Sequence, residues 1–145
     1  MAMRRPRRVP QYRLADSAQQ LVGGFLLAGP FVVTEEVWRL AANMSIVQSL
    51  GVVTMVFSIG YATLYKADTS RDPDEEQNVS GIPIRFISLM AVSFGSVTIL
   101  ALLFGAPETF LASEPNPTLI TAKAVSVGAV FSVVGAATAD SVFSR

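Results

Sequence analysis

Hydrophobic and polar positions follow one another along this chain in long blocks rather than in short alternations. Four apolar runs cover approximately residues 19–39, 46–65, 85–105 and 119–140. Each run is close to the roughly 20 residues that a helix needs to cross a hydrocarbon core of about 30 Å. Since backbone polar groups in lipid must bond within their own segment, the runs are predicted as helices. The pattern predicts an all-α membrane protein with four transmembrane helices.

Polar segments mark the ends of these helices. Ser17 to Gln20 reads as a capping box at the start of the first helix, and Asn116 with Pro117 supplies a cap and a first-turn proline for the fourth. Residues 66–84 are rich in turn formers and form the longest predicted loop. The chain therefore divides into a basic segment, 1–16, and a four-helix transmembrane domain, 17–145.

Basic residues predict the orientation, because short cytoplasmic segments carry an excess of lysine and arginine. With a cytoplasmic amino terminus, only Arg39 flanks the helices outside, and Lys123 lies within the fourth helix. The inside then holds Arg4, Arg5, Arg7, Arg8, Arg13, Lys66, Arg71, Arg85 and Arg145. We therefore predict a multi-pass protein of the cell membrane, with both termini and the 66–84 loop in the cytoplasm.

Composition supports a membrane class and narrows the chemistry. Apolar residues make up 51% of 145 residues and charged residues 15%, with a mean hydropathy of +0.48. The absence of cysteine and histidine removes disulfides, thiol nucleophiles, imidazole bases and most zinc sites. Phosphate-binding glycine loops and catalytic-triad spacings are also absent. We expect no enzyme, cofactor or metal site, and the basic amino terminus is expected to meet anionic lipid rather than nucleic acid.

Two adjacent carboxylates near the outer end of the first predicted helix are the main candidate site. Thr34, Glu35 and Glu36 could line an ion pathway or its entrance. Arg39 has the spacing to pair with either glutamate on one helix. Because neighbouring residues on a helix point about 100° apart, the second glutamate could then face the bundle interior.

Two other charged residues have alternative interpretations. Lys123 lies at a depth similar to that of Glu36, so it could pair with Glu36 across helices or extend its amine to the headgroups. Asp140 lies near the cytoplasmic end of the fourth helix, at a depth close to Arg13, Arg85 and Arg145. Interfacial pairing is favoured for Asp140, although a carboxylate lining a cytoplasmic mouth gives the same pattern.

Small residues and one proline predict how the helices bend and pack. Gly29 and Pro30 should kink the first helix, and packing is a more common reason for such a kink than ion binding. Gly128, Ser132 and Gly135 on the fourth helix permit close approach of another backbone, within the subunit or between subunits.

The stretch "GGFLLAGPFVVTEEVW" resembles the opening segment of a family of prokaryotic integral membrane proteins of unknown function. In that family a glycine-rich apolar run leads through a proline to Thr-x-Glu-Val-Trp. Thr34, Glu36, Val37 and Trp38 match the pattern, whereas Glu35 stands where the family tends to have an apolar residue. The resemblance implies a prokaryotic multispan protein, implies no activity, and favours Glu36 over Glu35.

Two function classes follow from these observations. The first is a homo-oligomeric channel or carrier for small ions, cations in particular, with Glu36 supplying negative charge at the external entrance. The second is a non-transporting scaffold or accessory subunit, in which the same groups are interfacial ion pairs. The clustering of three polar positions beside a kink favours transport.

Overall fold

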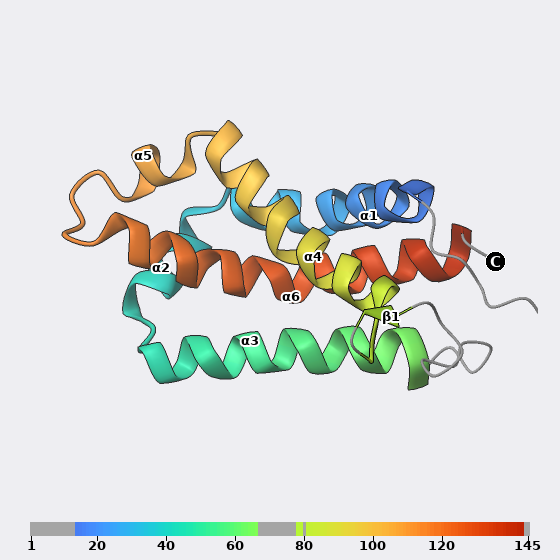
Figure 1. The fold of residues 1–145 in the computed structure, drawn as a ribbon. Coiled ribbons are helices and arrows are strands. Elements are labelled where there is room, and N and C mark those ends of the chain that lie inside the picture. Colours follow the sequence, from blue (N-terminus) through green and yellow to red (C-terminus); the bar gives the residue numbers. More distant parts are fainter. Residues whose placement is uncertain (1–13, 67–77, 80, 144–145) are drawn as a thin grey trace, which may run out of the picture.

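The polypeptide forms a bundle of long helices, described in the computed structural model for residues 14–66, 78–79 and 81–143 (Figure 1). Residues 1–13 of the predicted basic segment, most of the 66–84 loop and the last two residues lie outside these ranges. Residues 14–16 already belong to the first helix, so the predicted capping box at Ser17 is wrong. Leu14, where the first helix begins, and Phe143, where the last one ends, lie at the same end of the bundle (Figure 1). We call this the terminal end.

The first predicted helix, 19–39, is broken rather than continuous. Helix α1 (Leu14–Val32) and helix α2 (Glu35–Asn43) are bent by 82° at the break between them. The prediction of one span with a kink at Gly29 and Pro30 is wrong in position, because Pro30 stays inside α1. Helix α2 therefore turns away from the direction of α1 at the end of the bundle opposite the termini, the α2 end (Figure 1).

Hydrogen bonds at the break explain why α1 can end inside an apolar run. Thr34 has an extended backbone, with φ −100° and ψ 137°. Its backbone N–H and its Oγ1 both donate to the carbonyl oxygen of Phe31, at 3.2 and 2.8 Å. The indole Nε1 of the buried Trp38 donates to the carbonyl oxygen of Val32 at 2.8 Å. Side chains of the Thr-x-Glu-Val-Trp segment thus satisfy carbonyls that a helix end would otherwise leave unpaired.

The second span begins with a complete capping box. Helix α3 (Ile46–Tyr61) is preceded by Ser45, whose side chain and backbone exchange hydrogen bonds with Gln48. It continues as a π-helical turn, η1 (Ala62–Lys66). Two short antiparallel strands, β1 (Asn78–Val79) and β2 (Ile82–Pro83), pair Asn78 with Pro83 and Val79 with Ile82.

The third and fourth spans are joined by a short helix. Helix α4 (Ile84–Leu103) is followed by Phe104 and then by Gly105, which has a left-handed backbone (φ 66°) that glycine adopts readily. Helix α5 (Ala106–Phe110) follows, and helix α6 (Pro117–Phe143) runs back to the terminal end. These bounds lie close to the predicted 85–105 and 119–140.

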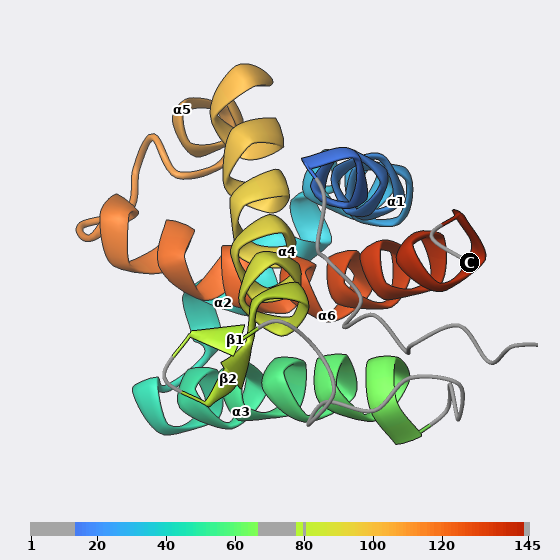
Figure 2. The same ribbon diagram turned by 45° about the vertical axis from the view of Figure 1, so that its right-hand side comes forward.

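Helix α6 is the centre of the bundle and packs against α1, α2, α3 and α4 (Figures 1 and 2). One apolar cluster, around Trp38, Ala101 and Ile120, lies toward the α2 end. A second, around Leu64, Leu89 and Val133, joins α3, α4 and α6. Of the best apolar stretch of each helix, 56% is buried in α6 but only 11% in α3, so α3 lies at the periphery.

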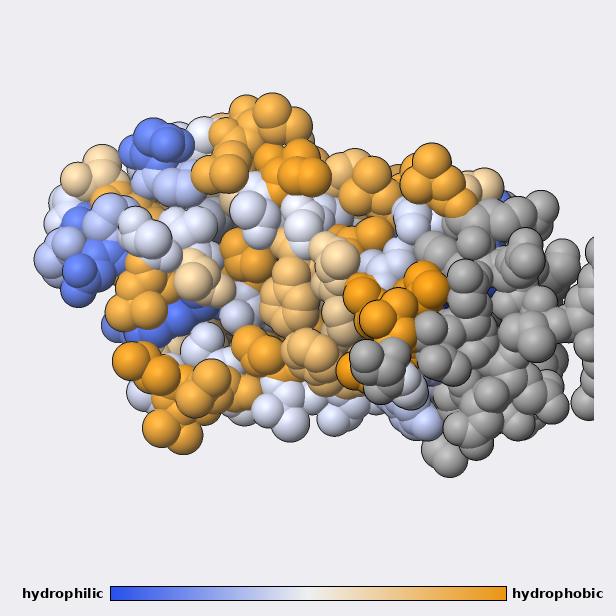
Figure 3. Space-filling model, in the orientation of Figure 1, coloured by the Kyte–Doolittle hydropathy of each residue, from blue (hydrophilic) through white to orange (hydrophobic). Residues whose placement is uncertain are grey.

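Three helices of the described ranges, α4, α6 and α3 with η1, are long and apolar enough to cross a membrane, or four if α1 and α2 form one broken span. Many large apolar side chains point outward, including Leu26 of α1 and Val47 of α3. Figure 3 shows apolar side chains over the middle of one face and hydrophilic ones at the α2 end. This arrangement suits a bundle whose solvent is lipid.

Candidate functional site

A cluster of buried charged residues joins three helices near the terminal end. Arg85 of α4 donates from Nη1 to Asp140 of α6 at 2.5 Å and from Nη2 to Asp16 of α1 at 3.3 Å. The residues are 7%, 0% and 2% exposed, respectively. Two buried carboxylates sharing one guanidinium are costly to desolvate, and polar groups of this kind inside a membrane bundle are frequently functional. Asp140 thus pairs with one of the arginines that lie close to it in predicted depth, and the pair is buried inside the bundle rather than exposed at an interface.

Side-chain hydroxyl and amide groups continue from this cluster toward the middle of the bundle. Ser88 lies 2.8 Å from Ser17 and donates to Oε1 of the buried Gln20 at 2.7 Å. Farther along, the hydroxyls of Ser96 and Ser132, both fully buried, lie 2.7 Å apart across α4 and α6. We call these residues the polar seam: Asp16, Ser17, Gln20, Arg85, Ser88, Ser96, Ser132 and Asp140.

Glycines let α1 come close to α6 along this seam. A Cβ atom on Gly24 would lie 2.7 Å from the Ser132 hydroxyl and 2.9 Å from that of Ser96. A Cβ on Gly135 would collide with the carbonyl oxygen of Gly23, and one on Gly23 would collide with that of Gly135. The two backbones are therefore in direct contact, which closes the space between α1 and α6 at this level.

The predicted packing residues of the last helix are used within the subunit. Gly135 contacts α1, Ser132 contacts Ser96, and a Cβ on Gly128 would lie 2.6 Å from a methyl group of Val97 in α4. Gly29 is less closely packed, because a Cβ atom there would have a Leu100 methyl group as its nearest neighbour, at 3.9 Å. The sequence left open whether this face packs within or between subunits. In the structure Gly128, Ser132 and Gly135 all pack within the subunit.

At the α2 end, the two adjacent glutamates have different surroundings. Glu35 accepts from Arg39 at 2.8 Å, one of the two pairings that the spacing allowed. Glu36 is exposed, and no residue in the described ranges forms an ion pair with it. The expectation that one of them would face the interior is not met, because both lie exposed in the first turn of α2.

Lys123 has a role that neither sequence interpretation included. Its Nζ donates to the carbonyl oxygen of Met44 at 2.6 Å, and the residue is only 9% exposed. The predicted pair with Glu36 is therefore absent, and the side chain does not extend to solvent. Met44 is the C-cap of α2, so a cation here complements the negative end of the α2 dipole and ties α6 to the α2–α3 corner.

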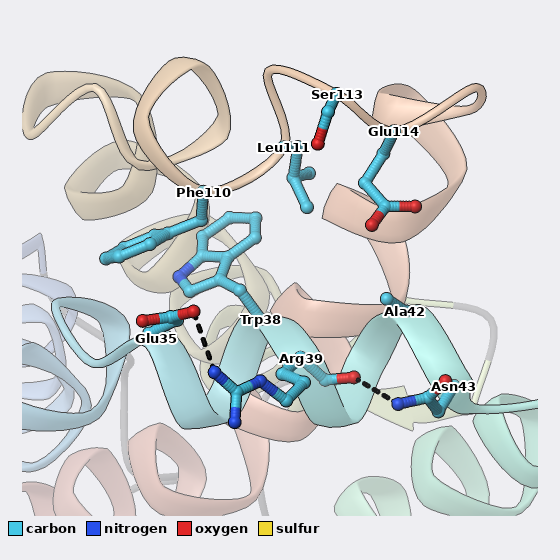
Figure 4. Close-up of a pocket in the computed structure, with 9 residues that line it drawn as sticks. All are labelled: Glu35, Trp38, Arg39, Ala42, Asn43, Phe110, Leu111, Ser113 and Glu114. Atoms are coloured by element: carbon cyan, nitrogen blue, oxygen red, sulfur yellow. Dashed lines mark hydrogen bonds and ion pairs between the residues drawn. The ribbon is translucent and has the colours of Figure 1, made fainter.

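A pocket of about 270 Å³ lies between α2 and the segment that follows α5 (Figure 4). Glu35 and Arg39 stand on the α2 side, and Ser113 and Glu114 face them from the connection between α5 and α6 (Figure 4). Trp38 and Phe110 form an aromatic wall, with ring centroids 6.1 Å apart. Glu36 is not among its lining residues.

Sequence reasoning missed Asp16, Gln20 and the Ser96–Ser132 pair as members of one site. A signal was available, because Asp16 and Gln20 stand four residues apart and so share a helix face. Nothing in the sequence showed that this face meets Arg85 and Asp140. The sequence identifies Trp38 only as part of a motif, because its bond to Val32 cannot be predicted unless the break is known.

The fold and the polar seam define a class: an α-helical integral membrane protein with buried charged groups inside its bundle. A family model described as "Putative integral membrane protein (DUF2391)" matches residues 3–142, so the chain belongs to this family of unknown function, as the resemblance predicted. No curated protein and no solved structure matched the chain.

Proposed function

We propose that this protein is a carrier for small ions, cations in particular. The observation that carries the proposal is the polar seam, in which buried charges at the terminal end continue as hydrogen-bonding side chains to mid-bundle. The Asp16–Arg85–Asp140 cluster places two carboxylates and a guanidinium inside the bundle. Carboxylate, amide and hydroxyl oxygens in such a row can replace part of the hydration shell of a cation.

The closed contact between Gly23 and Gly135 favours a carrier over an open channel. Passage along the seam requires α1 to move away from α6 at this level, because the two backbones touch. The break at Thr34 supplies a point about which α1 can move while α2 stays fastened by Trp38 and Lys123. Alternating access by movement of one element against the rest follows this scheme.

The remaining predicted residues take defined places in this proposal. Glu36 supplies exposed negative charge at the α2 end, whereas Glu35 is neutralised by Arg39 and Thr34 caps α1. The excess of basic residues supports a cytoplasmic terminal end and an external α2 end. The proposal includes assembly into a homo-oligomer, since four spans offer little room for an aqueous path within one subunit. It does not include catalysis.

A scaffold is the second candidate, and the same close packing favours it. Backbone contact at Gly23 and the mutual hydrogen bond of Ser96 and Ser132 are also what a rigid bundle needs. The two candidates differ in one measurable property, because a scaffold carries no ions.

Flux in proteoliposomes tests the proposal. The parent protein should move monovalent cations faster than empty vesicles, and replacing both Ser96 and Ser132 with alanine should reduce that flux about tenfold. The estimate comes from losing roughly 1 to 2 kcal/mol of polar interaction along the path, at 1.4 kcal/mol per factor of ten.

Ser126→Ala is the matched control. Ser126 is also a buried serine of α6, but its hydroxyl donates to the Ala122 carbonyl of its own helix at 3.1 Å, outside the seam. Its flux should equal that of the parent at matched incorporation. Parent flux no greater than that of empty vesicles would establish the scaffold instead, and equal losses in both variants would remove the seam from the pathway.

Orientation is tested by single cysteines, which the cysteine-free chain permits. In intact cells an impermeant thiol reagent should label cysteine at Ser113 and leave cysteine at Ala2, Thr69 or Ser144 unlabelled until the membrane is opened. The physical reason is the excess of basic residues retained on the cytoplasmic side. The opposite labelling pattern would reverse the orientation.

A further inference from the structure

The pocket at the α2 end, outside the polar seam, has the features of a ligand site. From its lining side chains we propose that it binds a primary ammonium group carried on a short apolar arm. The proposal does not depend on ion transport along the seam, because it concerns the opposite end of the bundle.

The charge of the lining favours a cation. Two carboxylates and one guanidinium line the pocket, and Glu35 already accepts from Arg39 at 2.8 Å. Glu114 is half-buried on the facing side, and its carboxylate forms no ion pair within the described ranges. A cation entering the pocket therefore meets one uncompensated negative charge, at Glu114 (Figure 4).

Hydrogen-bonding groups point to a primary ammonium rather than a quaternary one. Asn43 donates from Nδ2 to the Arg39 carbonyl at 3.1 Å, which leaves its Oδ1 available as an acceptor. Ser113 adds a hydroxyl beside Glu114. An –NH₃⁺ group has three donors for such oxygens, whereas a trimethylammonium group has none.

Metal ions fit the pocket less well. A hard divalent cation takes six to eight oxygen ligands, usually with several carboxylates. Here one of two carboxylates is held by a guanidinium, and the described residues contain no group of three acidic side chains that could hold a metal.

The aromatic wall accounts for the apolar arm. Trp38 is fixed by its bond to the Val32 carbonyl, and Phe110 stacks on it. Trp38 is only 2% exposed, so the half-buried Phe110 supplies the accessible ring surface. A cation near this ring is favoured electrostatically, and the ring shields a short alkyl chain from water. At about 30 Å³ per water, 270 Å³ is the space of about nine waters, enough for a small amine or a lipid headgroup.

Trp38 is the chain's one tryptophan and packs against Phe110 at the pocket, so its fluorescence reports on a change at that ring. The full-length protein in detergent should show a saturable change in Trp38 emission with n-butylammonium, and none with n-butanol, which has the same shape but no charge. Glu114→Gln should raise the Kd for n-butylammonium at least tenfold. Glu36→Gln, which removes a glutamate outside the pocket, should change it by less than twofold.

Each departure from this result has a defined meaning. Equal responses to butylammonium and butanol would show an apolar crevice without an ammonium site, and an unchanged Kd in Glu114→Gln would overturn the assigned recognition. Ligand-free emission in Glu114→Gln must match the parent, which shows that the wall is intact. Should the emission differ, protection of a cysteine at Ser113 from thiol reagent by butylammonium gives the same test without the Gln variant.

Two lipid arms distinguish the source of the ammonium group. In nanodiscs of phosphatidylethanolamine, occupation by the lipid headgroup should abolish the butylammonium titration, whereas phosphatidylglycerol nanodiscs should preserve it. Preservation in both lipids assigns the pocket to a free amine. Loss of ion flux in the serine double variant leaves these titrations unaffected, so failures of the two proposals are separable.

Discussion

Replacing Gly135 with alanine should destabilise the bundle by about 3 kcal/mol, the upper part of the usual range for overpacking. The added Cβ would meet the carbonyl oxygen of Gly23, and backbone atoms cannot rotate away as a side chain can. Helices α1 and α6 would have to separate, which would also disturb the nearby Ser96–Ser132 contact. Unfolding in mixed micelles, followed by circular dichroism, measures the change.

Gly51→Ala is the matched control, because a Cβ there has no atom within 4 Å. Alanine favours helix over glycine by roughly 1 kcal/mol, so this variant should be as stable as the parent or more so. Gly128→Ala should fall between the two, since its neighbour is the side chain of Val97. If Gly135→Ala and Gly51→Ala unfold alike, α1 and α6 are not in backbone contact.

Arg85→Met should cost about 3 to 5 kcal/mol, the usual penalty for removing one partner of a buried ion pair. The substitution keeps most of the side-chain volume but leaves Asp16 and Asp140 without the guanidinium that bridges them. A second substitution, Asp140→Asn, should restore part of the loss, because it removes one of the buried negative charges. Thermal unfolding of both variants in detergent checks these values.

Arg39→Met supplies the comparison for an exposed pair. Arg39 is 68% exposed and Glu35 62%, so breaking this pair should cost no more than about 1 kcal/mol. A similar cost for Arg85→Met would show that the Arg85 cluster is open to water. Full recovery of stability in the double variant, together with lost flux, would separate the structural role of the cluster from transport.

The membrane class and the span positions could be predicted from sequence because they depend on local properties. A helix that crosses lipid needs a minimum length of apolar residues. The runs at 46–65, 85–105 and 119–140 each have that length. A pair between Arg39 and one of the two glutamates was predictable for a similar reason, and the structure has it at Glu35. Residues four apart on one helix are neighbours whatever surrounds them.

The sequence predicted a bend in the first helix but not the position of the break after α1. Gly29 and Pro30 predicted a kink in the first helix. In the structure Pro30 remains helical, and the chain turns at Thr34. A turn inside an apolar run cannot be predicted from hydropathy, because hydropathy gives no information on the direction of the chain. The turn is stable because Trp38 folds back onto the Val32 carbonyl and Lys123 reaches the far end of α2.

By itself, the sequence determined the family, the lipid environment of the helices and the approximate position of each helix. These properties depend on residue type and local spacing. Only the tertiary structure decided which polar groups meet. Asp16 and Arg85 are 69 positions apart and Arg85 and Asp140 are 55 apart, and their contact depends on how each helix is rotated and tilted. That rotation is set by backbone contact at Gly23 and Gly135, where the absence of side chains lets two helices touch. Lipid does not determine the rotation of a helix, because it solvates every apolar face of the helix equally well.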